Sequence, residues 1–243
     1  SSKAAETERT DVAEAVAFLR RFLEEPKWAI ERIEKTLEGE SGFDDPDDHF
    51  DLFKRHLTHL PNTQAETVYK RICRDLIHGQ GGLEVCELKK SGEIGLRTSA
   101  GGTKELPYFA VINIGDVPAF KKHLYEKLGI ETKDDHFSGS LFDAVKQPDS
   151  PIPVLIGAKK FIEGWSSWRV SAMGLLNVGK GEGSQVIQLF GRGVRLKGRD
   201  KSLKRSDHLP GPHPDGLQHL ETLYIFGWNA DYIQIFRETL ERE

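Results

Sequence analysis

Apolar residues change their spacing near residue 79 of this 243-residue chain, and that change limits the folds that the chain can adopt. Before it, apolar side chains recur at the three- and four-residue intervals of amphipathic helices. After it, short apolar runs of strand length alternate with helical segments. Such alternation is typical of an α/β fold with a mostly parallel sheet flanked by helices. We therefore expect an all-helical extension over residues 1–78 and an α/β domain over residues 79–243.

Four helices are expected in the extension, because helix start and stop signals separate its apolar stripes. In chain order these signals are Asp11 with Glu14, Pro26 and Gly39, Pro61 after the run from Phe50 to Leu57, and the capping-box pair Thr63 and Glu66.

The α/β part is expected to begin with a hairpin and to continue with single strands and helices. Ligands of such folds bind at the loops beyond the carboxyl ends of the strands. The expected strands are 83–88, 94–98, 108–115, 153–158, 170–178 and 222–227. The expected helices are 117–128 behind the cap Asp116, a short one near Leu141, one from Ser184 and one after Asn229, with a polar loop over 198–218.

The net charge of −4 is unevenly distributed along the chain. Residues 1–78 hold 12 Lys and Arg against 17 Asp and Glu, a net of −5, whereas residues 154–205 hold 11 against 3, a net of +8. A basic stretch on an acidic protein indicates a site for an anion such as phosphate or nucleic acid, and a solvated surface is the alternative.

Cysteine content and hydropathy indicate the environment of the chain. Cys73 and Cys86 have no zinc-site spacing, and two cysteines cannot form a disulfide framework, so we expect two reduced thiols in or near the core. No apolar run approaches the ~20 residues of a membrane helix, and no signal-peptide pattern is present, so a soluble, cytoplasmic protein is expected. The start at Ser1 without methionine indicates a fragment or a processed chain.

The segment QLFGRGVR, residues 188–195, is the most informative motif. On a helix, Gln188, Arg192 and Arg195 project from one face. Gly191 and Gly193 each cost a helix ~1 kcal/mol relative to alanine, which favours a close approach of the backbone to a ligand or a facing domain. Two guanidinium groups on one face suit a polyphosphate, and an amphipathic helix with solvated arginines is the alternative.

This segment resembles the last motif of superfamily 2 helicases and translocases, Gln-x-x-Gly-Arg-x-x-Arg. Residues 159–171, KKFIEGWSSWRVS, resemble the preceding motif, K-x-F-x-E-G-W-D, of the DEAD/DEAH-box proteins related to the motor subunits of type III restriction enzymes. The run YFAVINIGD, residues 108–116, is similar to the strand that opens their second RecA-like domain. The resemblance covers residues 83–243 and implies the C-terminal RecA-like domain of an ATP-dependent DNA motor.

The resemblance also implies roles for individual residues. Arg192 and Arg195 correspond to arginine fingers for the ATP γ-phosphate, and Gln188 to a coupling residue beside them. Ser166 replaces the acidic residue that often binds the ribose, which puts that sugar contact in doubt. Trp165 and Trp168 could stack on bases or pack in the core. The implied nucleotide-binding positions are Gly164, Ser166 and Gly191, and the implied nucleic-acid contacts are Lys159, Lys160, Trp165 and Arg169.

These motors bind ATP and Mg²⁺ mainly through a phosphate loop and an acidic pair on a first RecA-like domain, and neither is convincing in this sequence. The run GLLNVGKG, residues 174–181, has Gly181 where Ser or Thr must hold magnesium, so a strand end with a glycine turn is the better interpretation. Asp47 with Glu87 and Lys89 weakly resembles the acids and lysine of a metal-dependent nuclease. A loop with metal-ligand residue types has no zinc spacing: Asp207, His208, His213, Asp215 and His219.

The sequence therefore predicts a motor domain that supplies arginine fingers and backbone contacts to a partner first domain, and that hydrolyses ATP negligibly alone. A non-enzymatic nucleic-acid-binding module is the first alternative. The second is the motor part of a type III-like restriction endonuclease, with cleavage by another domain. No metal site is expected in the chain itself, and no membrane partner.

Overall fold

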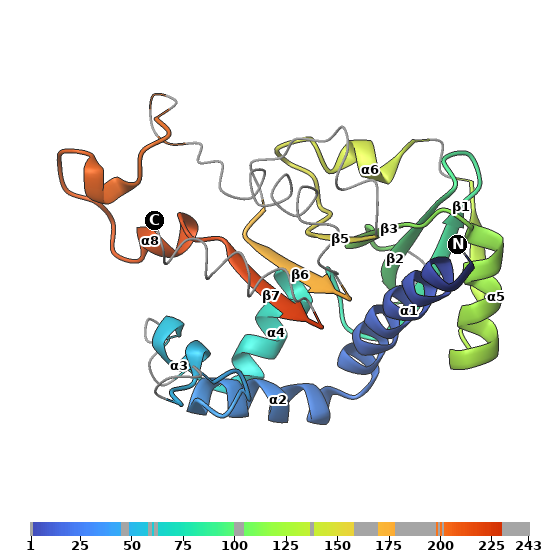
Figure 1. Ribbon diagram of the computed structural model, residues 1–243, viewed down its shortest axis with the longest axis horizontal. Helices are drawn as coiled ribbons and strands as arrows, with labels where there is room; N and C mark the ends of the chain where they lie inside the picture. The colour runs from blue at the N-terminus through green and yellow to red at the C-terminus, as the bar shows by residue number, and fades with distance from the viewer. Residues whose placement is uncertain are drawn as a thin grey trace. The chain divides into compact units, whose positions relative to one another are not determined.

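A computed structural model describes residues 2–44, 49–57, 60, 63–99, 105–136, 139–157, 170–177, 198, 200 and 202–229. The chain divides into two compact units, Ser1–Ala158 and Lys159–Glu243. Figure 1 shows their helices and strands, coloured in chain order. The expected boundary after residue 78 separates helical from strand-containing sequence, and it stays a prediction.

Helices make up the first part of the N-terminal unit, as expected. Three starting points differ from the prediction. The first helix begins before Asp11, because the preceding residues include good helix formers and no glycine or proline. The third helix begins at Leu52 and not at Phe50. The reason is that the side chain of Asp51 caps it by accepting from the N–H of Lys54.

The fourth helix begins after Gln64, and no side chain caps it, so the predicted Thr63–Glu66 capping box is wrong. The helices are α1 (Ser2–Glu24), α2 (Pro26–Glu38), α3 (Leu52–His56) and α4 (Ala65–Asp75).

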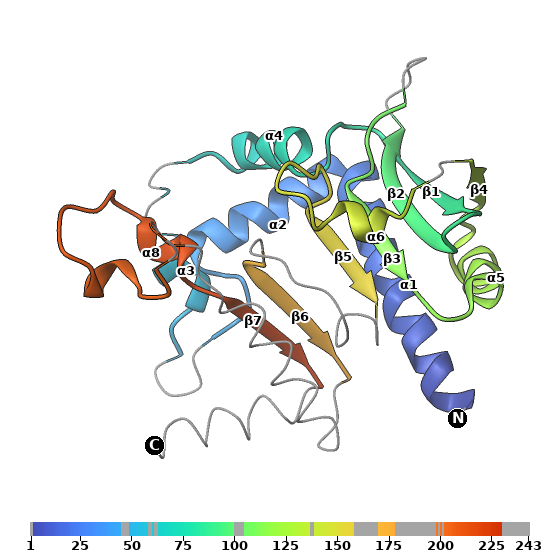
Figure 2. The same cartoon turned by 90° about the horizontal axis from the view of Figure 1, so that it is seen from above.

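Helix α2 has the ends that the sequence predicts. Pro26 occupies its first turn, where the missing N–H would have no helical partner. Gly39 closes it in the left-handed conformation with a φ of 83°. Helix α4 packs along α2 (Figure 2), and a small core forms between them around Ala29, Tyr69 and Cys73.

A five-stranded sheet forms the rest of the N-terminal unit. Its order is β4-β1-β2-β3-β5. Strand β2 runs antiparallel to both β1 and β3, whereas β1 pairs with β4, and β3 with β5, in parallel. The unit is therefore α/β with a mixed sheet, and the expected mostly parallel sheet is not confirmed. The strands are β1 (Gly82–Leu88), β2 (Glu93–Ser99), β3 (Ala110–Asn113), β4 (Thr132–Asp135) and β5 (Val154–Gly157).

The β1–β2 hairpin is confirmed, and β4 was not predicted. Gly92 turns the hairpin with a φ of 65°, and its N–H donates to the carbonyl of Leu88 at 2.9 Å. Strand β4 has the sequence TKDD, which offers no apolar alternation. It lies at the edge of the sheet, where short strands with charged side chains are common.

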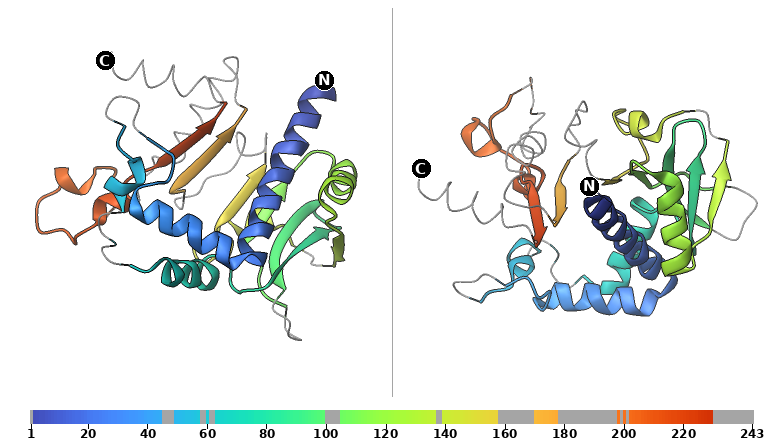
Figure 3. Two further views of the ribbon diagram at one scale, coloured as in Figure 1. Left: turned by 90° about the horizontal axis from the view of Figure 1, so that it is seen from below. Right: turned by 45° about the vertical axis from the view of Figure 1, so that its right-hand side comes forward.

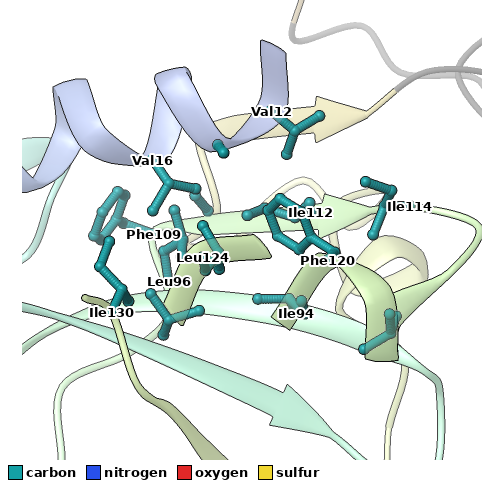
Figure 4. Packing of buried hydrophobic residues seen from close by; sticks show 14 of the residues in the cluster. Val12, Val16, Ile94, Leu96, Phe109, Ile112, Ile114, Phe120, Leu124 and Ile130 are labelled. Carbon is teal, nitrogen blue, oxygen red and sulfur yellow. The ribbon is translucent and has the colours of Figure 1, made fainter. Parts of the chain in front are cut away.

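Helices α1 and α5 (Val117–Leu128) cover one face of the sheet (Figure 3). Asp116 caps α5 as predicted, because its side chain accepts a hydrogen bond from the N–H of Ala119 at 3.0 Å. The two helices are also joined directly, since Arg20 donates to the carbonyl of Leu128 at 2.8 Å. Figure 4 shows the apolar layer between helices and strands, formed by Val12, Val16, Ile94, Leu96, Phe109, Ile112, Ile114, Phe120, Leu124 and Ile130.

A smaller core lies on the opposite face, because successive residues of a strand point to opposite sides. It contains Cys86 and Leu88 of β1, Val111 of β3 and Leu141 of the short helix α6 (Leu141–Ala144). Cys73 and Cys86 are both buried and free, which confirms the two core thiols.

The C-terminal unit is described in part. Strands β6 (Ala172–Leu176) and β7 (Tyr224–Trp228) confirm the two expected strands and pair in parallel, from Ala172 opposite Tyr224 to Leu176 opposite Trp228. The connection between them contains a short 3₁₀ helix, η4 (Ser206–His208), and α8 (Leu217–Leu220). The helices expected from Ser184 and after Asn229 lie outside the described residues. Among the described helices, none is long and apolar enough to cross a bilayer.

Candidate functional site

The residues that the sequence resemblance singles out lie outside the described part of the chain. Their assigned contacts with ATP and nucleic acid therefore stay predictions. They are Gln188, Gly191, Arg192 and Arg195 of the arginine segment, and Lys159, Lys160, Gly164, Trp165, Ser166 and Arg169 of the preceding segment.

The strands on either side of both segments are described, and they run in parallel pairs. Strand β5 ends at Gly157, two residues before Lys159, and lies parallel to β3. The arginine segment falls in the connection between β6 and β7, which are parallel to each other. Each segment thus follows the carboxyl end of a parallel strand in the sequence, which is where α/β folds bind ligands.

The glycine-rich run after β6 is described as far as Asn177. Gly174 belongs to the strand, and Asn177 adopts the left-handed conformation with a φ of 52°. The N–H of Asn177 donates to the carbonyl of Trp228 at 2.9 Å, and its side-chain oxygen accepts from Asn229 at 2.8 Å. These bonds fasten the ends of β6 and β7 together, as expected of a strand end. Gly179 and Lys180 lie outside the described residues.

A compact cluster of carboxylates and lysines lies at the end of β1. Glu87 and Asp134 are opposite each other on β1 and β4. The ammonium of Lys89 is 2.9 Å from Glu87 and 3.2 Å from Asp134, and Lys121 of α5 donates to Glu87 as well. The hydrogen bond from Lys121 holds the pKa of Glu87 below its usual value. Two carboxylates therefore face two ammonium groups. Asp47, the third member of the nuclease-like set with Glu87 and Lys89, lies outside the described residues.

A second charged network surrounds Arg97 on β2, which is only 7% exposed. Its Nε donates to Glu84 at 2.9 Å and its Nη2 to Glu105 at 3.0 Å. The guanidinium lies over the ring of Tyr108, 5.5 Å from the centroid, and the Tyr108 hydroxyl donates to Asp135. Sequence reasoning missed this network, although an arginine within the otherwise well-buried strand EIGLRTS was a usable signal.

The pKa values of Arg97, Tyr108 and Glu84 are shifted away from neutral pH. Burial lowers the pKa of Arg97, but hydrogen bonds to Glu105 and Glu84 outweigh that effect and raise it. Burial and the bond to Asp135 raise the pKa of Tyr108. The hydrogen bond from Lys133, at 2.6 Å, lowers the pKa of Glu84. Because a general acid or base needs a pKa near the working pH, these shifts indicate a positioning network and not a proton-transfer site.

The space for the Tyr108 ring depends on Gly95 of β2. A Cβ atom at residue 95 would lie 2.5 Å from carbon atoms of that ring, closer than van der Waals contact allows. Glycine therefore leaves room for the ring of Tyr108 beside β2, within reach of the Arg97 guanidinium. The geometry ties β2, β4 and the segment before β3 into one polar layer.

No group of three or more His, Cys, Asp or Glu side chains is arranged to hold a metal ion within the described ranges. The histidine-containing loop is engaged in local contacts. A ring nitrogen of His213 lies 3.0 Å from the carbonyl oxygen of Leu209, and Nδ1 of His219 lies 3.4 Å from the Tyr224 hydroxyl. The described residues thus do not present the ligand set that Mg²⁺ requires.

Comparisons with family models, with curated proteins and with solved structures found no match to this chain. The class that the fold itself defines is an α/β protein with a mixed five-stranded sheet flanked by helices.

Proposed function

We propose that the chain is the C-terminal motor domain of an ATP-dependent superfamily 2 DNA helicase or translocase, related to the motor subunits of type III restriction enzymes. Arg192 and Arg195 would neutralise the ATP γ-phosphate across a cleft shared with a first RecA-like domain, with Gln188 beside them. Lys159, Lys160, Trp165 and Arg169 would contact the DNA strand. The partner first domain would hold Mg²⁺ through its phosphate loop and acidic pair, as the resemblance implies.

The observation that best supports this proposal is the order of the three motif segments along the chain. Each segment contains a strand or follows one in the sequence. The first segment contains β3, the second begins two residues after β5, and the third lies between β6 and β7. The pairs β3–β5 and β6–β7 are parallel, which is compatible with the proposal, and they belong to two separate sheets. The charge distribution also supports the proposal, since the net of +8 between residues 154 and 205 spans the second and third segments.

The test joins this chain to a first RecA-like domain that has a phosphate loop and measures DNA-stimulated ATP hydrolysis. We expect Arg192→Ala and Arg195→Ala each to lower turnover ~10³-fold or more, the range found for arginine fingers. Arg205→Ala is the matched control, because Arg205 is an exposed arginine in the same basic stretch, outside the motifs. Turnover that survives both finger substitutions would show that the assignment is wrong.

A second measurement separates DNA contacts from ATP contacts. Lys159→Ala with Lys160→Ala should reduce the salt dependence of DNA binding by roughly two phosphate contacts. The isolated chain should hydrolyse ATP negligibly. Robust hydrolysis that disappears with Lys180→Ala would instead make the glycine-rich run after β6 a true phosphate loop.

A further inference from the structure

Large apolar side chains gather at the surface beside α3, at the end of α2 that lies away from α1 (Figure 1). Phe43 is 50% exposed, and Phe50 and Leu52 are each 40% exposed. These three side chains, here called the apolar patch, belong to none of the three cores found among the described residues. Exposed apolar patches with a polar rim mark interaction sites, whereas single exposed apolar residues are ordinary.

Local bonds hold the patch in one arrangement. The N–H of Leu52 donates to the carbonyl of Phe43 at 2.9 Å, so these two residues are neighbours. The ring of Phe43 also meets the ring of Phe53 on α3, with centroids 5.7 Å apart. Asp51, which caps α3, is 5% exposed and accepts from the N–H of Ser41 at 2.6 Å as well. The loop that carries Phe43 is thus fastened to α3, and a preformed surface lowers the cost of binding.

Acidic residues surround the patch. Residues 38–51 contain seven Asp and Glu and no Lys or Arg. Glu38, Glu40 and Asp44 are exposed, and none of them forms an ion pair with another described residue. Asp44 directly follows Phe43 in the chain. The apolar patch therefore has a negatively charged rim.

The sign of this charge selects the kind of partner. Phosphate groups, of nucleic acids or of lipids, would be repelled by the acids. Lys54 of α3 can offset only one of the seven negative charges. A protein segment with Lys or Arg beside apolar side chains fits both features, because it would cover the patch and balance the acidic rim.

We infer that the apolar patch of Phe43, Phe50 and Leu52 is a docking surface for a basic amphipathic segment of a partner protein. The apolar side chains of that segment cover the patch, and its Lys or Arg side chains pair with Glu40 and Asp44. The inference concerns the helical part of the N-terminal unit and does not rest on the proposed motor function.

The test uses a short fluorescein-labelled peptide of Leu and Lys, with all its Leu on one face of a helix, and follows fluorescence anisotropy as the full chain is added. Two matched peptides, one with Glu in place of Lys and one with Ser in place of Leu, separate charge from apolar contact. Each should bind ~10-fold more weakly or worse, a difference of about 1.4 kcal/mol or more. If either matched peptide binds as tightly, or the Leu–Lys peptide does not bind, the inference fails.

Two variants locate the apolar contact. Phe43→Ser and Phe50→Ser should each weaken binding of the Leu–Lys peptide ~10-fold, because buried aromatic anchors supply much of the binding energy of an interface. Phe18→Ser is the matched control, since Phe18 is 56% exposed on α1. Circular dichroism of the free variants establishes that each is folded. Wild-type affinity in both patch variants, or an equal loss in the control, would overturn the inference.

A further variant tests the acidic rim. Glu40→Gln combined with Asp44→Asn should weaken binding and reduce its salt dependence. The control combines Glu131→Gln with Asp149→Asn, two exposed acids elsewhere in the N-terminal unit. Equal effects of the two double variants would count against the rim.

Sedimentation velocity of the chain alone tests a different occupant. The chain should not associate through this surface. If it dimerises and Phe43→Ser makes it monomeric, a second copy covers the patch and the inferred partner is wrong.

Discussion

The two faces of the five-stranded sheet are stabilised by different interactions. The face under α1 and α5 is apolar: Val16, Ile112, Phe120 and Leu124 are all 0% exposed. The opposite face combines a smaller apolar core with buried charge, because Glu93 and Arg97 are 2% and 7% exposed. Apolar burial is non-directional, whereas buried charges require defined partners. The first face therefore supplies most of the stability, and the second fixes where particular segments lie.

Glu93 illustrates this positioning on the second face. Its carboxylate accepts hydrogen bonds from the hydroxyl of Ser140 and the N–H of Leu141, both at 2.7 Å. It thus holds the first turn of α6 against β2, the second strand of the hairpin. A carboxylate at a helix N-terminus also interacts favourably with the unpaired N–H groups there.

The largest effect should come from the apolar face. Phe120→Ala leaves a cavity among residues that cannot collapse, so we expect a loss of ~3–5 kcal/mol in the free energy of unfolding. Urea unfolding followed by circular dichroism measures it. Tyr125→Ala, on the exposed side of the same helix, should stay within ~0.5 kcal/mol. A loss below ~1 kcal/mol for Phe120→Ala would contradict the dominance of this face.

A smaller effect is expected on the charged face. Arg97→Met keeps an apolar stem but removes the partner of Glu84 and Glu105. Breaking a fully buried pair costs ~3–5 kcal/mol, and because Glu105 is 73% exposed we expect about 2–3 kcal/mol. The same unfolding experiment tests it, with Arg74→Met as control, since Arg74 pairs with Asp75 on the surface of α4. Equal effects of the two substitutions would show that the network adds nothing to stability.

The smallest effect concerns acid pH. The pKa values of Glu84 and Glu87 are lowered in the fold by hydrogen bonds, first from Lys133 and Lys121 respectively. Their contribution is thus complete above the unfolded pKa of about 4.5 and is lost as the pH falls through the folded values. Urea midpoints measured from about pH 7 to pH 3 should fall less in the double variant Glu84→Gln, Glu87→Gln than in the wild type. If the urea midpoints of the double variant fall with pH as much as those of the wild type, Glu84 and Glu87 do not contribute to the pH dependence of stability.

The sequence predicts the apolar face better than the charged one. Helix α5 was placed by Asp116 and by the apolar residues that follow it, and the hairpin by the turn residues around Gly92. These are local signals that need no knowledge of the fold. The hairpin makes β2 antiparallel to β1, whereas the antiparallel pairing of β2 with β3 joins separate segments, and local sequence does not specify it.

Strand β4 and the partners of Arg97 could not be predicted for a related reason, although Arg97 itself stands out within the strand EIGLRTS. Lys133 and Asp135 are polar residues in a polar run, and they become informative only when β4 lies beside β1. Arg192 and Arg195 are the opposite case. The order of their motif along the sequence supports a function, but both residues lie outside the described part of the chain, so their contacts stay a prediction.

The contact between Arg20 and Leu128 has a consequence for how the protein is made. Its partners are 108 positions apart, so α1 leaves the ribosome well before the residues that bury it. At ~5–20 residues per second, the apolar stripe of α1 waits ~5–20 s for β3 and α5 to follow. During synthesis the apolar stripe of α1 therefore stays in contact with water until β3 and α5 have emerged, so α1 can be buried only once the sheet is nearly complete.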